Sequence, residues 1–349
     1  MTDLLELINY GRQENCSDIH LTAALSPVFR HNGELVPGPF KLSGDEIEKI
    51  IIDMLNERDR EKLKKGMDAD FCYETPEGLR QRVNVYHQQG ELCAAVRLLN
   101  DTIPTFKELH LPPIIRKLSC EPRGLILITG PTGSGKSTTL AAMLDYINQN
   151  MAKHILTIED PVEYRHFHKK SIVHQREVGV DVDSFSNALR SSLREDPDVI
   201  LVGEMRDYET ISAAVTAAET GHLVLSTLHT IGAANTIDRI IDVFPPHSQQ
   251  QIRTQLASTL KGVITQQLVP LATGEGRMAA LEVMTGTDAV LNLIRESKTH
   301  QLGSVMQTGS KDGMNTLNSH LAKLVKENQI SFDVGLQWAS DKNEFNQYF

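Results

Sequence analysis

The segment Gly130–Ser137 reads GPTGSGKS and fits the phosphate-loop pattern GxxxxGK[ST]. An aliphatic run, Leu125–Thr129, precedes this loop, and a helix-like run over Ser137–Asn150 follows it. Glycines let the backbone turn its N–H groups inward around an anion, and the N-terminus of the helix adds a partial positive charge. A glycine-rich turn that only joins a strand to a helix is the alternative, and the spacing disfavours it. The loop therefore predicts a phosphate site at the edge of an α/β sheet.

The predicted contacts to the phosphates come from this loop and from the residues just after it. Lys136 is expected to neutralise the charge of the β- and γ-phosphates, and the Ser137 hydroxyl is expected to bind Mg²⁺. ATP and Mg²⁺ are therefore the predicted cofactors. The residues expected to contact nucleotide are Gly130, Pro131, Thr132, Gly133, Ser134, Gly135, Lys136, Ser137 and Thr138.

Carboxylates follow two other aliphatic runs. Ile155–Ile158 leads into Glu159, and Val199–Val202 leads into Gly203 and Glu204. Strand carboxyl ends are where the polar groups of such sites collect, and an NTPase needs an acidic group near the metal and a group that orients water. Because Gly203 stands where an Asp often holds the metal's water, Glu204 is the predicted catalytic residue. It is also expected to reach Mg²⁺, directly or through water. A solvated strand end or a helix N-cap is the alternative.

Three more polar residues are candidates for the same site. Glu163 follows Glu159 closely, and His222 and His229 flank the aliphatic run Leu223–Leu228. An imidazole at a strand end can sense a γ-phosphate or hydrogen-bond a carboxylate, although an isolated histidine is more often structural. Glu163 and His229 are therefore predicted catalytic residues, whereas Glu159 and His222 are predicted nucleotide contacts.

The hydrophobic pattern changes along the chain and predicts two domains. Residues 1–100 read as an α/β unit with a small antiparallel sheet, with helices over 2–14 and 45–65 and strands over 18–21, 27–30, 70–73, 79–88 and 92–98. Repeated prolines in 101–123 predict a linker that contains one short helix. Residues 124–349 predict a parallel sheet with crossover helices, then a mainly helical region with a strand pair over 262–270 and 277–284.

Composition excludes several classes of function. The formal net charge of −10 over 349 residues argues against a grip on a phosphate backbone, so nucleic acid is not an expected partner. No apolar run has the roughly 18 residues of a transmembrane helix, and the acidic Asp3 and Glu6 do not suit a signal peptide. The expected location is the cytosol. Four scattered cysteines predict neither a zinc site nor a redox pair: Cys16, Cys72, Cys93 and Cys120.

Three segments, taken with the phosphate loop, resemble the nucleotide-site signatures of the secretion ATPase superfamily. Residues 157–164 (TIEDPVEY) resemble its Asp box, residues 194–207 its Walker B segment, and residues 220–230 its His box. The likeness extends over about residues 120–300, and the N-terminal unit resembles the family's PAS-like domain. The resemblance implies an α/β fold in which a PAS-like α+β domain precedes a RecA-like P-loop ATPase domain with a helical C-terminal region.

Within that superfamily the chain resembles the type IV pilus retraction ATPases of the PilT/PilU type. Residues 289–296 (AVLNLIRE) are similar to their AIRNLIRE element, with Val290 and Leu291 in place of Ile and Arg. The tetracysteine insertion of assembly and secretion relatives does not appear. The resemblance implies an ATP-hydrolysing homo-hexameric motor for pilus retraction in twitching motility. It would act at the inner face of the cytoplasmic membrane by turning an inner-membrane platform protein, with a paralogous retraction ATPase as a further candidate partner. The resemblance does not separate PilT from PilU.

The resemblance also implies a role for arginines of the N-terminal domain at a neighbouring subunit's nucleotide. Arg80, Arg82 and Arg97 lie on the matching strands and are predicted catalytic residues, and alternation puts Arg80 and Arg82 on one strand face. The alternative is a solvated arginine stripe that keeps an edge strand soluble.

Three other functions stay open at this point. One is a pilus extension or type II secretion ATPase of the same superfamily. Another is a non-catalytic partner subunit of a mixed motor, against which the intact Lys136, Ser137 and Glu204 argue. The last is a DNA translocase, which the acidic balance and the 5% aromatic content do not favour.

Overall fold

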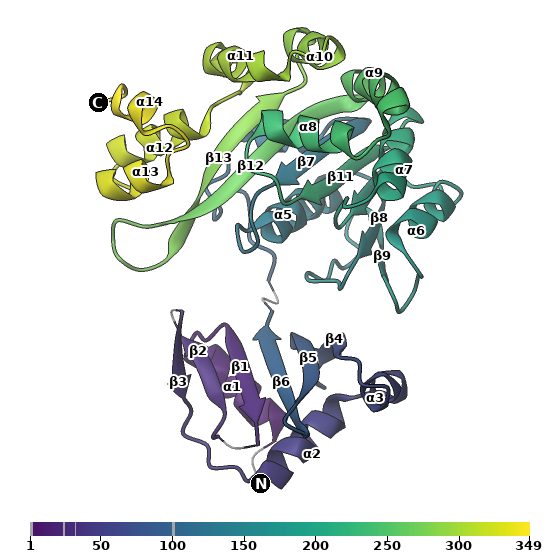
Figure 1. Ribbon diagram of the computed structural model, residues 1–349, viewed down its shortest axis with the longest axis vertical. Coiled ribbons are helices and arrows are strands. Elements are labelled where there is room, and N and C mark those ends of the chain that lie inside the picture. The colour runs from purple at the N-terminus through teal and green to yellow at the C-terminus, as the bar shows by residue number, and fades with distance from the viewer. Residues whose placement is uncertain (1–2, 24, 32, 100–101) are drawn as a thin grey trace. The chain divides into compact units, whose positions relative to one another are not determined.

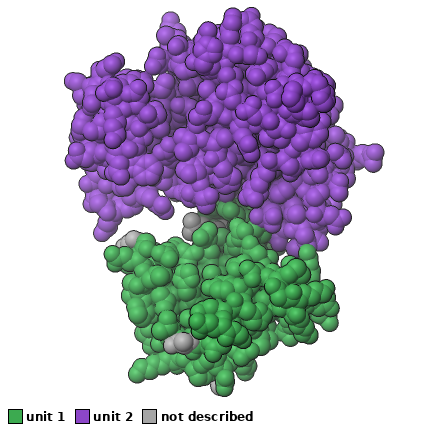
Figure 2. Space-filling model, viewed as in Figure 1, with its two compact units in different colours: residues 1–102, 161–165 green, residues 103–160, 166–349 purple. Residues whose placement is uncertain are grey.

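The computed structural model describes residues 3–23, 25–31, 33–99 and 102–349. The chain divides into two compact units, one of residues 1–102 with 161–165 and the other of residues 103–160 with 166–349 (Figure 2). Residues 103–123 thus belong to the second unit, including helix α4 (Pro113–Ser119), whose Ile115 and Leu118 are buried in its core. The sequence predicts a linker over 101–123 instead.

The first unit is an antiparallel sheet covered by helices. Its strand order is β3-β2-β1-β6-β5-β4, and every neighbouring pair is antiparallel, as predicted. Alternate residues of β5, such as Val83 and Val85, are fully buried against Leu7 and Ile47 of the helices. The strands are β1 (Asp18–Thr22), β2 (Val28–His31), β3 (Glu34–Pro37), β4 (Ala69–Glu74), β5 (Arg80–Gln88) and β6 (Glu91–Leu98), and the helices are α1 (Leu4–Gln13), α2 (Gly44–Met54) and α3 (Glu57–Lys64).

The structure of this unit differs from the sequence prediction at two places. The single helix over 45–65 is two helices, because Leu55 is extended and the Asn56 side chain caps α3 by accepting from the Asp59 N–H at 2.9 Å. Strand β3 was not predicted, because all four of its residues are exposed and it has no alternation to detect.

The second unit is built on a seven-stranded mixed sheet of order β13-β12-β7-β11-β10-β8-β9. All neighbours are parallel except β12 and β13, which form an antiparallel hairpin. The strands are β7 (Gly124–Thr129), β8 (His154–Glu159), β9 (Ile172–Glu177), β10 (Val199–Val202), β11 (Leu223–Leu228), β12 (Leu260–Pro270) and β13 (Arg277–Thr285). Strand β9 was not predicted, since it is an edge strand of mostly polar residues with Ile172 exposed.

Helices cover both faces of this sheet (Figure 1). Leu127 and Val224 face one hydrophobic cluster, and Ile126 and Leu225 face the other, which explains the uninterrupted aliphatic runs of the central strands. The helices are α5 (Lys136–Asn150), α6 (Phe185–Ser192), α7 (Tyr208–Glu219), α8 (Ala233–Asp242), α9 (Gln249–Thr259), α10 (Asp288–Arg295), α11 (Leu302–Thr308), α12 (Leu317–Lys326), α13 (Phe332–Trp338) and α14 (Lys342–Asn346).

The far end of the β12–β13 hairpin packs against the C-terminal helices. Val269 and Met278 share a hydrophobic cluster with Leu321 of α12 and Phe345 of α14. Among the described residues, no helix combines the length and the apolar character needed to cross a bilayer.

Candidate nucleotide-binding site

The phosphate loop joins the end of β7 to the start of α5, as the sequence predicts. Gly130 and Gly135 have φ angles of 140° and 85°, which favour glycine. A Cβ at Gly130 would lie 2.2 Å from the backbone oxygen of Gln266, so this position has no room for a side chain. The turn therefore needs the backbone torsions of glycine, and the neighbouring strand leaves no room for any larger residue at Gly130.

The first turn of α5 suits an anion. Its N-cap, Gly135, provides no side-chain cap, and the turn carries no acidic residue, so its backbone N–H groups have no competing carboxylate there. Lys136 is 8% exposed, and its Nζ donates to the carbonyls of Gly130 at 2.9 Å and Pro131 at 3.0 Å. Ser137 and Thr138 follow in the same turn. These donors and this charge fit the phosphates of a nucleotide.

Glu204 and His229 meet at the same edge of the sheet. Glu204 comes two residues after β10 ends, and His229 directly follows β11, whose last residue pairs with Thr129 of β7. The Glu204 Oε2 lies 3.6 Å from the His229 Nε2 and 2.8 Å from the Arg206 Nη2. They line a cavity of about 330 Å³, whose walls are Glu204, Met205, Arg206, Ile211, Thr227, Leu228, His229, Thr230, Arg239 and Val243.

The other predicted acidic residues lie further along the sheet or outside it. Glu159 ends β8, which is separated from β7 by β11 and β10, and its Oε1 accepts from the Thr157 hydroxyl at 2.6 Å and the Gln175 amide at 3.1 Å. Glu163 lies in residues 161–165, which belong to the first unit. Within the second unit, Glu204 lies at the edge that carries the phosphate loop. The catalytic role of Glu163 stays a prediction.

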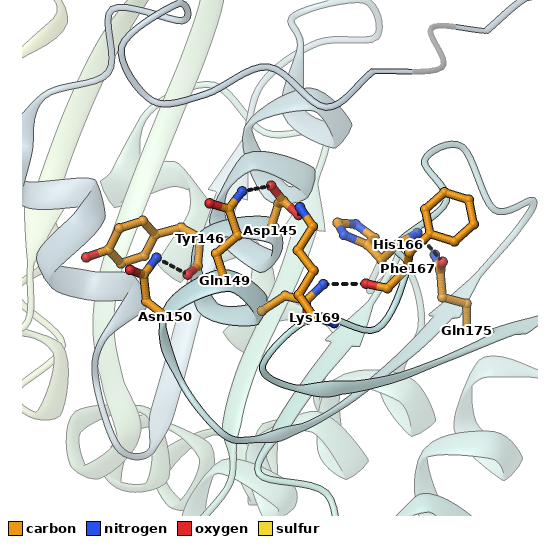
Figure 3. Close-up of polar contacts among 9 residues, drawn as sticks. Asp145, Tyr146, Gln149, Asn150, His166, Phe167, Lys169 and Gln175 are labelled. Carbon is orange, nitrogen blue, oxygen red and sulfur yellow. Dashed lines mark hydrogen bonds and ion pairs between the residues drawn. The ribbon is translucent and has the colours of Figure 1, made fainter.

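Residues 166–170 are fixed to the C-terminal half of α5 (Figure 3). Gln175 Oε1 accepts from the backbone N–H of His166 at 2.7 Å, and Asp145 of α5 pairs with Lys169 at 2.6 Å. Asn148 of α5 donates to the Phe167 carbonyl at 2.7 Å. Burial lowers the pKa of His166 to about 4, an effect that the nearby Asp145 opposes. The helix that starts at the phosphate loop thus also anchors residues 166–170.

A single chain does not bring His222 to its own phosphate loop, and the predicted nucleotide contact of His222 stays a prediction. His222 precedes β11, whereas the loop follows β7, and these strands are parallel. A six-residue strand separates the two edges by roughly 20 Å. His222 is instead held locally, with its Nδ1 2.9 Å from the Ala217 carbonyl oxygen.

The three predicted arginines have partners within the first unit. Arg80 Nη2 donates to the Val162 carbonyl at 2.8 Å, Arg82 pairs with a carboxylate of Asp70 at 2.8 Å, and Arg97 pairs with Asp18 at 3.0 Å. Their predicted reach to a neighbouring subunit's nucleotide stays a prediction.

Three residues at the site were missed by sequence reasoning. Arg206 lies two residues after Glu204, a spacing that could have pointed to it, whereas Arg239 reaches the cavity only through the packing of α8. Gln266 contacts the phosphate loop from β12. The only feature of the sequence that could have pointed to it is a polar residue within a buried strand.

A family model for type II/IV secretion system proteins matches residues 99–333. The chain belongs to this family. It is 48% identical to the type IV pilus retractation ATPase PilT of Pseudomonas aeruginosa, over 94% of this chain and 96% of that protein. It is 39% identical to the type IV pilus ATPase PilU of the same organism, over 97% and 89% of the two chains.

A solved structure agrees with these relatives. The crystal structure of the pilus retraction motor PilT with bound ADP superposes with a TM-score of 0.92 at 46% identity, covering 99% of this chain and 100% of that one. The predicted membership of the PilT/PilU-type secretion ATPases is confirmed. The predicted fold, an α+β domain followed by a P-loop ATPase domain with a helical C-terminal region, is confirmed as well.

Proposed function

We propose that this chain is an ATP-hydrolysing motor subunit that drives retraction of type IV pili. The observation that carries the proposal is the conjunction of two facts. The chain matches PilT over nearly its whole length, and its phosphate loop, Glu204 and His229 lie at one edge of one sheet. A chain that had lost catalysis would have no reason to keep all three.

Each residue of the site has a definite part in this reaction. The loop N–H groups bind the phosphates, and Lys136, which now donates to two loop carbonyls, would turn its ammonium to the β- and γ-phosphates. Ser137 and Glu204 would hold Mg²⁺, which neutralises phosphate charge when bound. Glu204 orients the attacking water or takes its proton, and the His229 Nε2 lies 3.6 Å from that carboxylate.

The assembly and its partners are proposed on the family resemblance. Six subunits would form a ring in which Arg80, Arg82 and Arg97 stabilise phosphoryl charge at a neighbour's site. The ring would work at the inner face of the cytoplasmic membrane by turning a platform protein there. A paralogous ATPase of the PilU type is a further candidate partner.

Phosphate release from Mg-ATP by the purified chain tests the chemistry. Glu204→Gln should lower kcat by about a hundredfold or more while ADP binding persists, because general-base or water-orienting groups contribute that much. Lys136→Ala should instead lose nucleotide affinity. Glu209→Gln, an exposed carboxylate at the start of α7, is the matched control and should behave as wild type. Unchanged turnover in Glu204→Gln would remove that residue from the active role.

A deletion strain tests the biological direction. Loss of a retraction motor should abolish twitching while surface pili accumulate. Loss of the pili themselves would identify an extension ATPase instead.

A further inference from the structure

Gln266 connects strand β12 to the phosphate loop through both ends of its side chain. The residue is 3% exposed and lies on the strand that flanks β7. Its Nε2 donates to the Ser134 carbonyl at 2.7 Å, and its Oε1 accepts from the Thr139 hydroxyl at 2.8 Å. One buried amide therefore joins the middle of the loop to the first turns of α5.

The backbone around Gln266 contacts the loop as well. A Cβ at Gly130 would lie 2.2 Å from the Gln266 carbonyl oxygen, and one at Gly135 would lie 2.8 Å from its Nε2. One residue earlier on β12, the Thr265 and Thr129 hydroxyls are 2.9 Å apart at the point where β7 enters the loop. Strand β12 thus touches the beginning, the middle and the end of the loop.

We propose that Gln266 is a positioning residue of the nucleotide site, which holds the phosphate loop in the shape that binds a nucleotide's phosphates. The proposal rests on the proposed function, because it assumes that this loop binds ATP and ADP. Its physical basis is that a buried carbonyl and a buried hydroxyl are costly to leave without partners, so the loop keeps the geometry in which the amide satisfies both.

The expected signature is a loss of binding more than of chemistry. The loop contacts phosphates in the ground state and in the transition state alike, so a misplaced loop raises KM and leaves kcat nearly unchanged. A residue that only stabilised the fold would shift the melting temperature without that split between KM and kcat.

ADP titration calorimetry and steady-state hydrolysis on the full chain test this inference. Gln266→Met has a similar volume but makes neither hydrogen bond, and it should weaken ADP binding and raise the KM for ATP about tenfold, with kcat within threefold of wild type. Gln267→Met is the matched control, since Gln267 is the next residue of β12 and is also buried. It should bind ADP like the wild type.

Thr139→Val provides a second variant that keeps the site's volume. It removes one of the two bonds and should weaken ADP binding by a smaller factor. The double variant Thr139→Val, Gln266→Met should bind no more weakly than Gln266→Met alone, because the shared bond is already lost. ADP affinity within twofold of wild type in both single variants would overturn the proposal. A wild-type chain that binds ADP but hydrolyses no ATP would count only against the proposed function.

Discussion

The Arg206 guanidinium and the Glu204 carboxylate form an ion pair, with Nη2 2.8 Å from the same Oε2 that His229 approaches at 3.6 Å. The Arg206 side chain is 71% exposed, whereas that of Glu204 is 22% exposed. An ion pair this exposed contributes little to folding, less than about 1 kcal/mol. Its consequence is therefore for the orientation of the carboxylate and not for stability.

Replacing Arg206 should separate orientation from stability. Arg206→Gln should lower kcat several-fold because Glu204 loses a partner that fixes its carboxylate. The free energy of unfolding should stay within about 1 kcal/mol of wild type. Hydrolysis assays and urea unfolding on the same preparation measure kcat and the free energy of unfolding. Arg206→Lys keeps the charge, so its kcat should fall between those of wild type and Arg206→Gln. An unchanged kcat in Arg206→Gln would show that the pair does not orient Glu204.

The sequence predicted best those features that depend on local chemistry. The loop from Gly130 to Ser137 and the aliphatic strands around it could be predicted from residue type and spacing. Left-handed torsions favour glycine at fixed positions, and burial on both sheet faces favours uninterrupted aliphatic runs. His222 shows the limit, since its distance from the loop depends on the strand direction between them. Gln266 shows it further, because its two bonds join residues more than a hundred positions apart.

Arg80 and Arg82 should differ in what their loss costs. Arg80 donates to the backbone carbonyl of Val162, and its Nη1 is a buried atom without a hydrogen-bond partner among the described residues. Arg80→Ala removes this charged hydrogen bond and should destabilise the first unit by about 1 to 3 kcal/mol. Arg82 makes a half-exposed ion pair with Asp70, so Arg82→Ala should cost less than about 1 kcal/mol.

Chemical unfolding, with hydrogen exchange of the β5 amides as the readout, measures which of the two variants loses more stability. ATPase assays on the same variants address the predicted catalytic role, since a transition-state arginine lowers kcat even where stability is unchanged. Equal stability losses in the two variants would contradict the structural assignment.

His320 should make the second unit sensitive to acid. Its Nδ1 accepts from the Leu281 N–H at 2.9 Å, and burial together with the charge of Lys323 lowers its pKa from 6.5 to about 4. In the unfolded chain His320 binds a proton below about pH 6.5, whereas in the folded chain it binds that proton only below about pH 4. Stability from this group is thus fully present above pH 6.5 and is lost as the pH falls toward 4.

Urea unfolding at pH 7.5 and pH 5 measures that loss. His320→Gln keeps an acceptor for Leu281 but does not titrate. Its free energy of unfolding should therefore fall by roughly 1 to 2 kcal/mol less than that of wild type between pH 7.5 and pH 5. His166 titrates in the same direction, beside Asp145 and Lys169, and should account for part of what remains. An identical pH dependence in wild type and His320→Gln would show that His320 is not the titrating group.

Glu282 of β13 should couple the helix after His229 to the sheet. Its Oε1 accepts from the Ala233 N–H at 2.7 Å, at the start of α8, whose own N-cap is Gly232 and supplies no side-chain cap. Burial raises the pKa of Glu282, and the hydrogen bonds from the N–H groups of Ala233 and Leu317 oppose that rise. Glu282→Ala should therefore destabilise the second unit by about 1 to 3 kcal/mol and lower turnover through the loop that carries His229.

The sign of the pH effect at Glu282 is opposite to that at His320. A carboxyl group whose folded pKa is raised contributes stability that is present below about pH 4.5 and is lost as the pH rises through the raised value. Glu282→Gln cannot lose a proton, so its stability deficit relative to wild type should be smaller at pH 8 than at pH 5. Because Gln keeps one acceptor for Ala233, it should retain more turnover than Glu282→Ala. Equal turnover in the two variants would mean that the cap on α8 does not position His229.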